Sequence, residues 1–62
     1  MFVKVNDLVG EPRIINTNAI CSIREVTFGG DKGKISITLN NGFVTLTKEE
    51  AQKIFNAIGV SL

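Results

Sequence analysis

A glycine-rich segment with two lysines is the part of this sequence whose residue types could bind an anion. It reads Gly29-Gly30-Asp31-Lys32-Gly33-Lys34. Successive backbone N–H groups and lysine ammonium groups can converge on a phosphate. The spacing is not that of a P-loop, because only three residues separate Gly29 from Gly33 and Ile35 stands in the Ser/Thr position. The composition favours a hairpin loop, and the alternative is a loop that binds a small anion or nucleotide through Gly29, Gly30, Lys32, Gly33 and Lys34.

Few other side chains could carry catalysis. Cys21 is the only cysteine and the chain has no histidine, so a thiolate nucleophile would lack its usual base. We therefore expect Cys21 to be a small, buried core residue. The adjacent carboxylates Glu49 and Glu50 are explained by their place at the start of a helix, where the macrodipole favours acidic side chains. These residues predict a non-enzymatic protein with no catalytic residue, no metal and no cofactor.

The length of 62 residues allows one domain, which we assign to residues 1–62. A fold of this size buries only about 60% of the surface of its unfolded chain, so its stability is marginal. One cysteine cannot form an intramolecular disulfide, and a metal site is disfavoured. Self-association is the remaining means of stabilisation, and we expect a homo-oligomer.

Charge and hydropathy disfavour several kinds of partner. The net charge is +1, and the basic residues are interleaved with acidic ones rather than gathered in an arm or stripe. This pattern disfavours nucleic-acid binding, which is kept as a third hypothesis. No stretch approaches the roughly 20 apolar residues that span a bilayer, and none has the pattern of a signal peptide. We expect a cytoplasmic protein without membrane insertion.

Three strands are predicted in the first half of the chain. Residues Phe2 to Val5 and Arg13 to Asn16 read as two strands joined by a segment rich in turn-forming residues. A third strand is expected within residues 19–28. Its apolar residues do not alternate regularly, because Ile20, Val26 and Phe28 share one parity and Ile23 has the other. A tight turn near Ala19 or a bulge near Arg24-Glu25 would bring both sets inward, and the sequence leaves these two alternatives open.

A hairpin and a helix are predicted in the second half. Asn41-Gly42 favours a two-residue type I′ turn, because both positions need a positive φ. This turn pairs Leu39 with Val44 and Ile37 with Leu46, and it directs one set of apolar side chains inward: Ile35, Ile37, Leu39, Val44 and Leu46.

Local signals define the helix that follows. Thr47 and Glu50 have the spacing of a capping box, and Gly59 stands where a helix commonly ends. Glu49 and Lys53 form an i, i+4 pair in the favourable order. One apolar stripe at helical spacing lies between these ends and consists of Ala51, Ile54, Phe55 and Ile58.

The order β-β-β-β-β-α predicts an α+β, mostly β fold. We expect a small bent antiparallel sheet or partly open barrel of about five strands, followed by one C-terminal amphipathic helix. The predicted inward sets leave Phe2, Phe43 and either Val9 or Leu62 on outer faces or at ends. Gathered in one patch, these residues would form an interface; ordinary scattered surface residues are the alternative. Open sheet edges offer a second route to partners.

The turn and strand residues resemble those of a known family. The pattern Val5-x-x-Leu8-x-Gly10-Glu11-Pro12, then Ile15-Asn16, Ile20-x-x-Ile23-x-Glu25 and Ile37-Thr38-Leu39-x-x-Gly42, is similar to that of the FlbD-like family of short bacterial proteins encoded with flagellar genes. The resemblance implies a bacterial origin and supplies no functional residue; small proteins of phage share this size and style, so a bacterial or phage origin is expected. The residues themselves favour a protein-interaction module, an adaptor, regulator or inhibitor of a larger partner, which also associates with itself.

Overall fold

The computed structural model describes residues 1–60 and shows five strands and one helix. A single turn of 3-10 helix, η1, joins the second strand to the third. The elements in chain order are β1 (Phe2–Asn6), β2 (Pro12–Asn16), η1 (Thr17–Ala19), β3 (Ile20–Glu25), β4 (Ile35–Leu39), β5 (Gly42–Leu46) and α1 (Lys48–Ile58).

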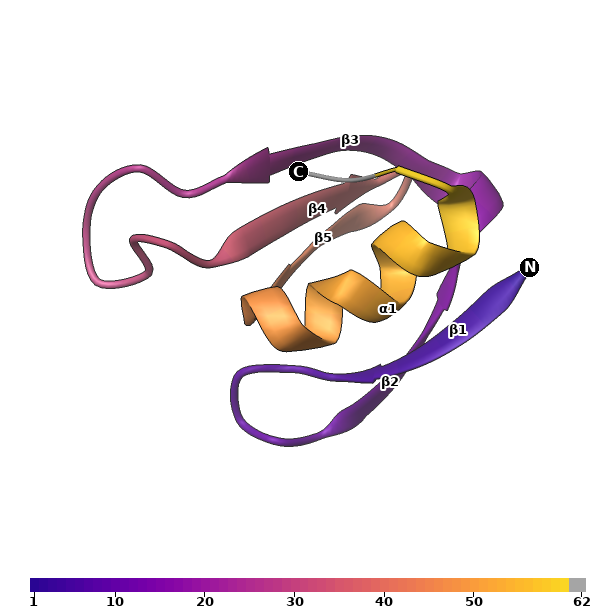
Figure 1. Ribbon diagram of the computed structural model, residues 1–62, viewed down its shortest axis with the longest axis horizontal. Helices are drawn as coiled ribbons and strands as arrows, with labels where there is room; N and C mark the ends of the chain where they lie inside the picture. Colours follow the sequence, from indigo (N-terminus) through magenta and orange to yellow (C-terminus); the bar gives the residue numbers. More distant parts are fainter. Residues whose placement is uncertain (61–62) are drawn as a thin grey trace.

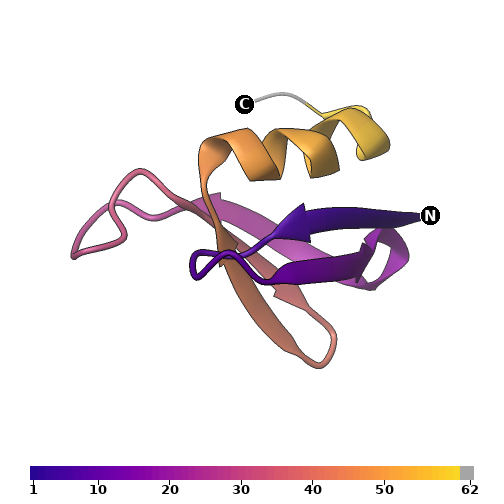
Figure 2. The same cartoon turned by 90° about the horizontal axis from the view of Figure 1, so that it is seen from below.

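The strands form two antiparallel sheets, and the predicted fold class is confirmed. β1 and β2 make a two-stranded ribbon, and β3, β4 and β5 make a three-stranded sheet with β4 in the centre. The sheets are not closed into a barrel. α1 packs against both sheets and runs alongside β1 in both views (Figures 1 and 2).

The register of the ribbon determines which side chains of β1 and β2 reach the core. Val3 pairs with Ile15 and Lys4 pairs with Ile14. Side chains alternate between the two faces of a strand, so Val5 and Ile15 are buried while the side chain of Ile14 is 70% exposed. The side chain of Asp7 closes the turn between the strands by accepting hydrogen bonds from the N–H groups of Val9 and Glu11.

β3 departs from the sequence-based expectation at both ends. The tight turn near Ala19 is confirmed as η1, but the pairing of β3 with β4 shifts between Ile20 and Ser22 rather than near Arg24-Glu25. This shift leaves Cys21 without a partner on β4 and turns its side chain to the solvent, so the predicted burial of Cys21 is wrong. β3 ends at Glu25, and Phe28 lies in the following loop with 77% of its surface exposed, so its predicted inward position is also wrong.

The hairpin of β4 and β5 has the expected inward face but a different register. Leu39 pairs with Gly42 and Ile37 with Val44, so the two turn residues are Asn40 and Asn41. No residue other than glycine in the described part of the chain has a positive φ, so the predicted type I′ turn at Asn41-Gly42 is wrong. Compared with the predicted pairing, each β4 residue pairs with the β5 residue two positions earlier in the sequence. A shift of two keeps every side chain on its face, because the side-chain period of a strand is also two.

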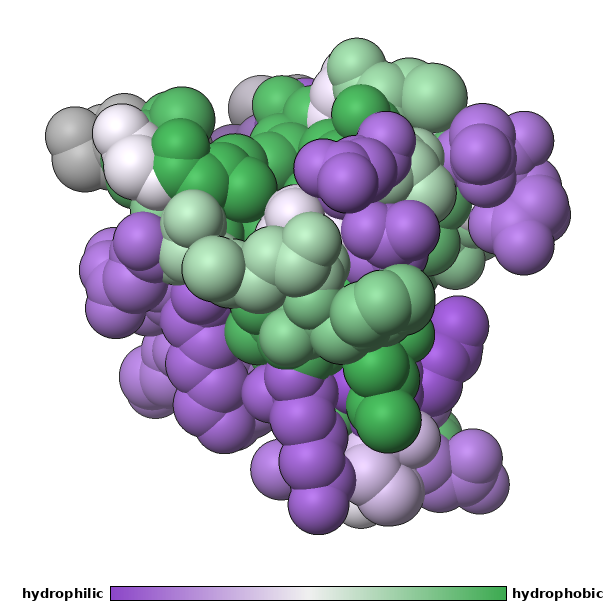
Figure 3. Space-filling model, turned by 90° about the vertical axis from the view of Figure 1, so that its right-hand side faces the viewer, coloured by the Kyte–Doolittle hydropathy of each residue, from purple (hydrophilic) through white to green (hydrophobic). Residues whose placement is uncertain are grey.

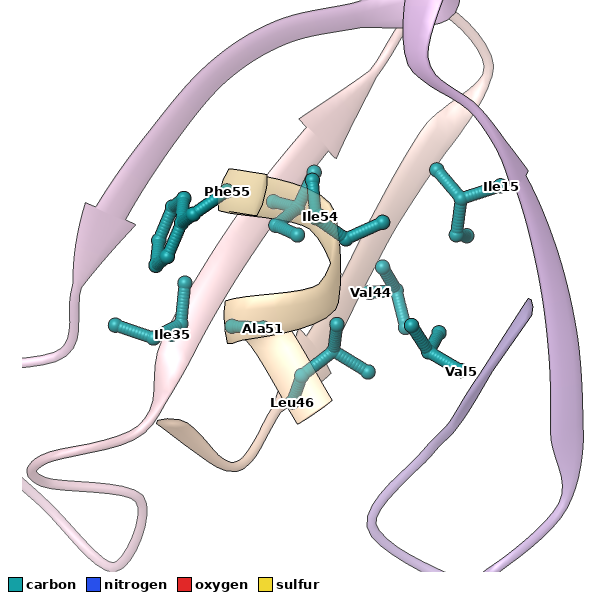
Figure 4. Packing of buried hydrophobic residues seen from close by; sticks show 9 residues of the cluster. Val5, Ile15, Ile35, Val44, Leu46, Ala51, Ile54 and Phe55 are labelled. Atoms are coloured by element: carbon teal, nitrogen blue, oxygen red, sulfur yellow. The ribbon is translucent and has the colours of Figure 1, made fainter. Parts of the chain in front are cut away.

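The core lies between α1 and the inner faces of both sheets (Figure 4). Ala51, Ile54 and Phe55 of α1 are buried as predicted. They pack against six buried strand residues, Val5, Ile15, Ile35, Ile37, Val44 and Leu46, and Leu39 is partly buried against the same cluster.

Hydrogen bonds at the two ends of α1 define where the helix begins and ends and attach its start to β1. The Oγ1 of Thr47 accepts a hydrogen bond from the N–H of Glu50 at 3.2 Å, which is half of the predicted capping box. The carboxylate of Glu50 instead accepts the N–H of Asn6 at 2.8 Å and thereby fastens the start of α1 to the end of β1. Lys53 pairs with Glu50 at 2.9 Å, not with Glu49, so the predicted i, i+4 pair is wrong. Gly59 ends the helix at φ 76°, as predicted.

Candidate interaction surfaces

Apolar side chains gather on the side of the molecule where β1 begins and α1 ends. Figure 3 shows this side, on which an apolar area is flanked by hydrophilic side chains. The start of β1 and the end of α1 lie at the same end of the molecule in both ribbon views. The exposed apolar residues of these two segments are Met1, Phe2, Ile58 and Val60, which we call the apolar end.

Backbone structure holds each part of the apolar end in place. The carbonyl oxygen of Met1 accepts hydrogen bonds from the N–H of Thr17 at 2.9 Å and from its Oγ1 at 3.1 Å. Phe2 points outward because Val3 and Val5 take the inward positions of β1, and 71% of its surface is exposed. The N–H groups of Gly59 and Val60 both donate to the carbonyl of Phe55, which fixes the end of α1.

The structure separates the residues predicted as an interface. Phe2 belongs to the apolar end, whereas Val9 lies in the turn at the opposite end of the β1–β2 ribbon. Phe43 lies on the outer face of the three-stranded sheet, opposite Thr38. Leu62 lies outside the described residues. Phe2, Val9 and Phe43 are all exposed, but they do not form one patch. The other residues of the apolar end were not predicted from the sequence. No local sequence pattern shows that Met1 and Ile58 lie at the same end of the folded chain.

The outer face of the three-stranded sheet carries an open depression of about 450 Å³. The floor contains Ser36, which is buried at the centre of the sheet. Arg24 and Phe43 stand on strands on either side of β4, and Arg24 forms no ion pair with any of residues 1–60. The depression is lined by Arg24, Ser36, Thr38, Leu39, Gly42 and Phe43. It is a shallow site with one cation, one aromatic ring and otherwise uncharged groups.

The predicted anion-binding loop uses several of its backbone donors internally. The N–H of Lys32 donates to Gly29, that of Lys34 to Asp31, and that of Gly33 to Val26. An anion cradle needs such N–H groups to point outward together, so the geometry adds no support to this hypothesis, which stays a prediction. Replacing Lys32 and Lys34 by Ala and measuring the anion-induced change in melting temperature tests it directly.

Charged side chains in the described part of the chain form local pairs rather than a reactive cluster. Arg13 pairs with Asp7 and Lys48 with Glu25, each at 3.6 Å. The N–H of Asn6, and then the ammonium of Lys53, lower the pKa of Glu50. Among residues 1–60 there is no group of three or more His, Cys, Asp or Glu side chains placed to share a metal ion. In the same range, no helix has the length and apolar character needed to cross a bilayer.

Comparison of the chain with protein-family models, curated proteins and solved structures found no match. The resemblance to the FlbD-like family therefore stays a prediction.

Proposed function

We propose that this chain is a non-enzymatic, cytoplasmic protein-interaction module that binds a larger partner protein through the apolar end. The observation that carries the proposal is that the start of β1 and the end of α1 lie at the same end of the molecule (Figures 1 and 2) and carry the exposed apolar residues Met1, Phe2, Ile58 and Val60. Single exposed apolar residues are ordinary on protein surfaces. A contiguous group rimmed by polar side chains is typical of a protein interface.

The exposed area is suited to the centre of an interface. The four side chains are between 36% and 71% exposed, which together equals about two whole side chains. Burial of a large apolar side chain contributes about 1.5–3 kcal/mol, so covering the apolar end supplies about 3–6 kcal/mol. This is less than the roughly 8 kcal/mol of a micromolar complex. The apolar end therefore acts as a hot spot that surrounding polar contacts must complete.

Site-specific photo-crosslinking in the host cell tests the proposal. A photoreactive phenylalanine analogue placed at position 2 should capture a discrete partner protein, whereas the same analogue at Val9, which is 80% exposed, should not. Ile58→Asp should abolish the capture at position 2. Equal products from positions 2 and 9, or a product at position 2 that persists in the Ile58→Asp variant, would show that the apolar end is not the binding surface.

We also propose that the module associates with itself. This rests on the small core, which lacks a disulfide, and on the general need of so small a fold for additional stabilisation.

A further inference from the structure

The turn between β4 and β5 contains an asparagine followed directly by a glycine, Asn41-Gly42. Both residues are exposed, and Figure 2 shows this turn on the side of the molecule opposite α1. A Cβ added at Gly42 would meet no atom within 4 Å apart from its neighbours in the chain, so the backbone here is open to solvent. The φ of Gly42 is 155°, which residues with a Cβ rarely adopt. The fold therefore favours a glycine directly after Asn41.

The side-chain amide of Asn41 forms no hydrogen bond with any of residues 1–60. Two other asparagines are held in place. The Oδ1 of Asn16 accepts the N–H of Asn18 at 3.0 Å, and the Oδ1 of Asn56 accepts a hydrogen bond from another side chain of α1 at 2.8 Å. The chain has six asparagines, and Asn41 alone precedes a glycine. It thus combines an unrestrained amide with a following residue that lacks a Cβ.

We propose that Asn41 is a site of spontaneous deamidation in the folded protein. The peptide nitrogen of Gly42 loses its proton and attacks the side-chain Cγ of Asn41; the bond from Cγ to the amide nitrogen breaks, and ammonia leaves. The product is a succinimide ring. Water then adds to either carbonyl carbon of the ring and breaks its bond to nitrogen: opening at Cγ gives isoaspartate's isomer aspartate, and opening at the main-chain carbonyl gives isoaspartate. Glycine permits the first step because no Cβ obstructs the close approach of the two groups.

The reaction changes both the charge and the backbone of the turn. A carboxyl group with the usual pKa of about 3.9 is ionised at neutral pH, so the new group cancels the net charge of +1. Asn41 and Arg13 line the same hollow between β2 and the turn, so the new carboxylate lies on the same hollow as a cation. In isoaspartate the main chain runs through Cβ and Cγ and is longer by an atom. A turn of two residues cannot absorb this change without disturbing the pairing of Leu39 with Gly42.

Incubation of the purified full chain at mildly alkaline pH, followed by trypsin digestion and mass spectrometry, tests the inference. The tryptic fragment of residues 35–48 contains Asn40 and Asn41. It should gain the mass of a hydroxyl in place of an amino group, and fragmentation should place the change at Asn41. The rate should rise with pH, because the deprotonated peptide nitrogen is the nucleophile. Asn41→Gln should abolish the change, since the longer side chain cannot form the succinimide ring. Asn40→Gln is the matched control and should convert at the wild-type rate.

The same incubation in urea separates the geometry of the turn from the general reactivity of the Asn41-Gly42 pair. We expect the folded and the urea-unfolded chain to convert at similar rates. The isolated isoaspartyl form should melt at a lower temperature than Asn41→Asp, which has the same charge and a normal backbone. Conversion confined to the unfolded chain, or equal conversion at Asn40 and Asn41, would overturn the inference. The inference is independent of the proposed function, because no residue of the apolar end takes part in the reaction.

Discussion

Ile14 and Ile15 are neighbours on β2 with the same side chain and opposite surroundings. Ile15 is 3% exposed and packs in the core, whereas Ile14 is 70% exposed on the outer face of the ribbon. Truncation of a buried isoleucine to alanine costs about 2–5 kcal/mol, from lost burial and the cavity that remains. The same truncation at an exposed site changes stability by at most about 0.5 kcal/mol, apart from a small loss of strand propensity.

These magnitudes are large for so small a protein. A chain of 62 residues has a free energy of unfolding of about 3–9 kcal/mol. Ile15→Ala should therefore lower the melting temperature by at least about 8 °C or leave the chain unfolded, because each kcal/mol is worth about 4–8 °C at this size. Ile14→Ala should remain within a few degrees of the wild type. Thermal unfolding followed by circular dichroism measures both melting temperatures, and urea unfolding gives the corresponding free energies. A larger loss for Ile14→Ala would refute the β1–β2 register, since a slip by one residue exchanges the two side chains.

Three further predictions concern α1. Thr47→Ala removes the hydroxyl that accepts the N–H of Glu50 and should cost about 1 kcal/mol in urea unfolding. Gly59→Ala places a Cβ at φ 76° and should cost about 1–2 kcal/mol, whereas Gly59→Asn should cost less, because asparagine tolerates this conformation. The pKa of Glu50 is lowered in the folded protein, so the ionised carboxylate stabilises the fold above its ordinary pKa, and the effect is lost as the pH falls through the lowered value. The stability difference between wild type and Glu50→Gln should thus be constant near neutral pH and should shrink in acid; a difference independent of pH down to pH 2 would contradict this role.

The helix could be predicted from the sequence because its signals are local. Thr47, the apolar stripe and Gly59 lie within thirteen residues, and each acts through contacts within one or two turns of the chain. One of the two hydrogen bonds of the predicted capping box does not form, and the reason is a residue far from the helix in the sequence. The carboxylate of Glu50 accepts the N–H of Asn6, which is 44 positions away. The N–H of Asn6 on β1 competes with the N–H of Thr47 for the carboxylate oxygen of Glu50. The sequence of the helix gives no indication of this competing donor.

The strands show what a hydrophobic pattern can and cannot decide. The inward set of β4 and β5 was correct although the pairing was not, because the observed and expected partners differ by two positions. Both registers bury Ile37 and Val44, so the pattern could not choose between them. Cys21 and Phe28 were placed wrongly because a register shift and an early end of β3 interrupt the alternation. Both features depend on pairing with β4 and have no turn signal of their own.

The apolar end follows from a mismatch between the helix and the sheets beneath it. The stripe of α1 continues through Ile58, yet burial stops at Phe55, and Ile58 is 36% exposed. Phe2 occupies the outward position of β1 at the same end, so neither residue is covered by the other strands. The monomer covers most of Ile58 and leaves 36% of its surface as exposed apolar area. Under the proposed function a partner protein covers this exposed part of the final turn, and crosslinking from position 2 tests that contact.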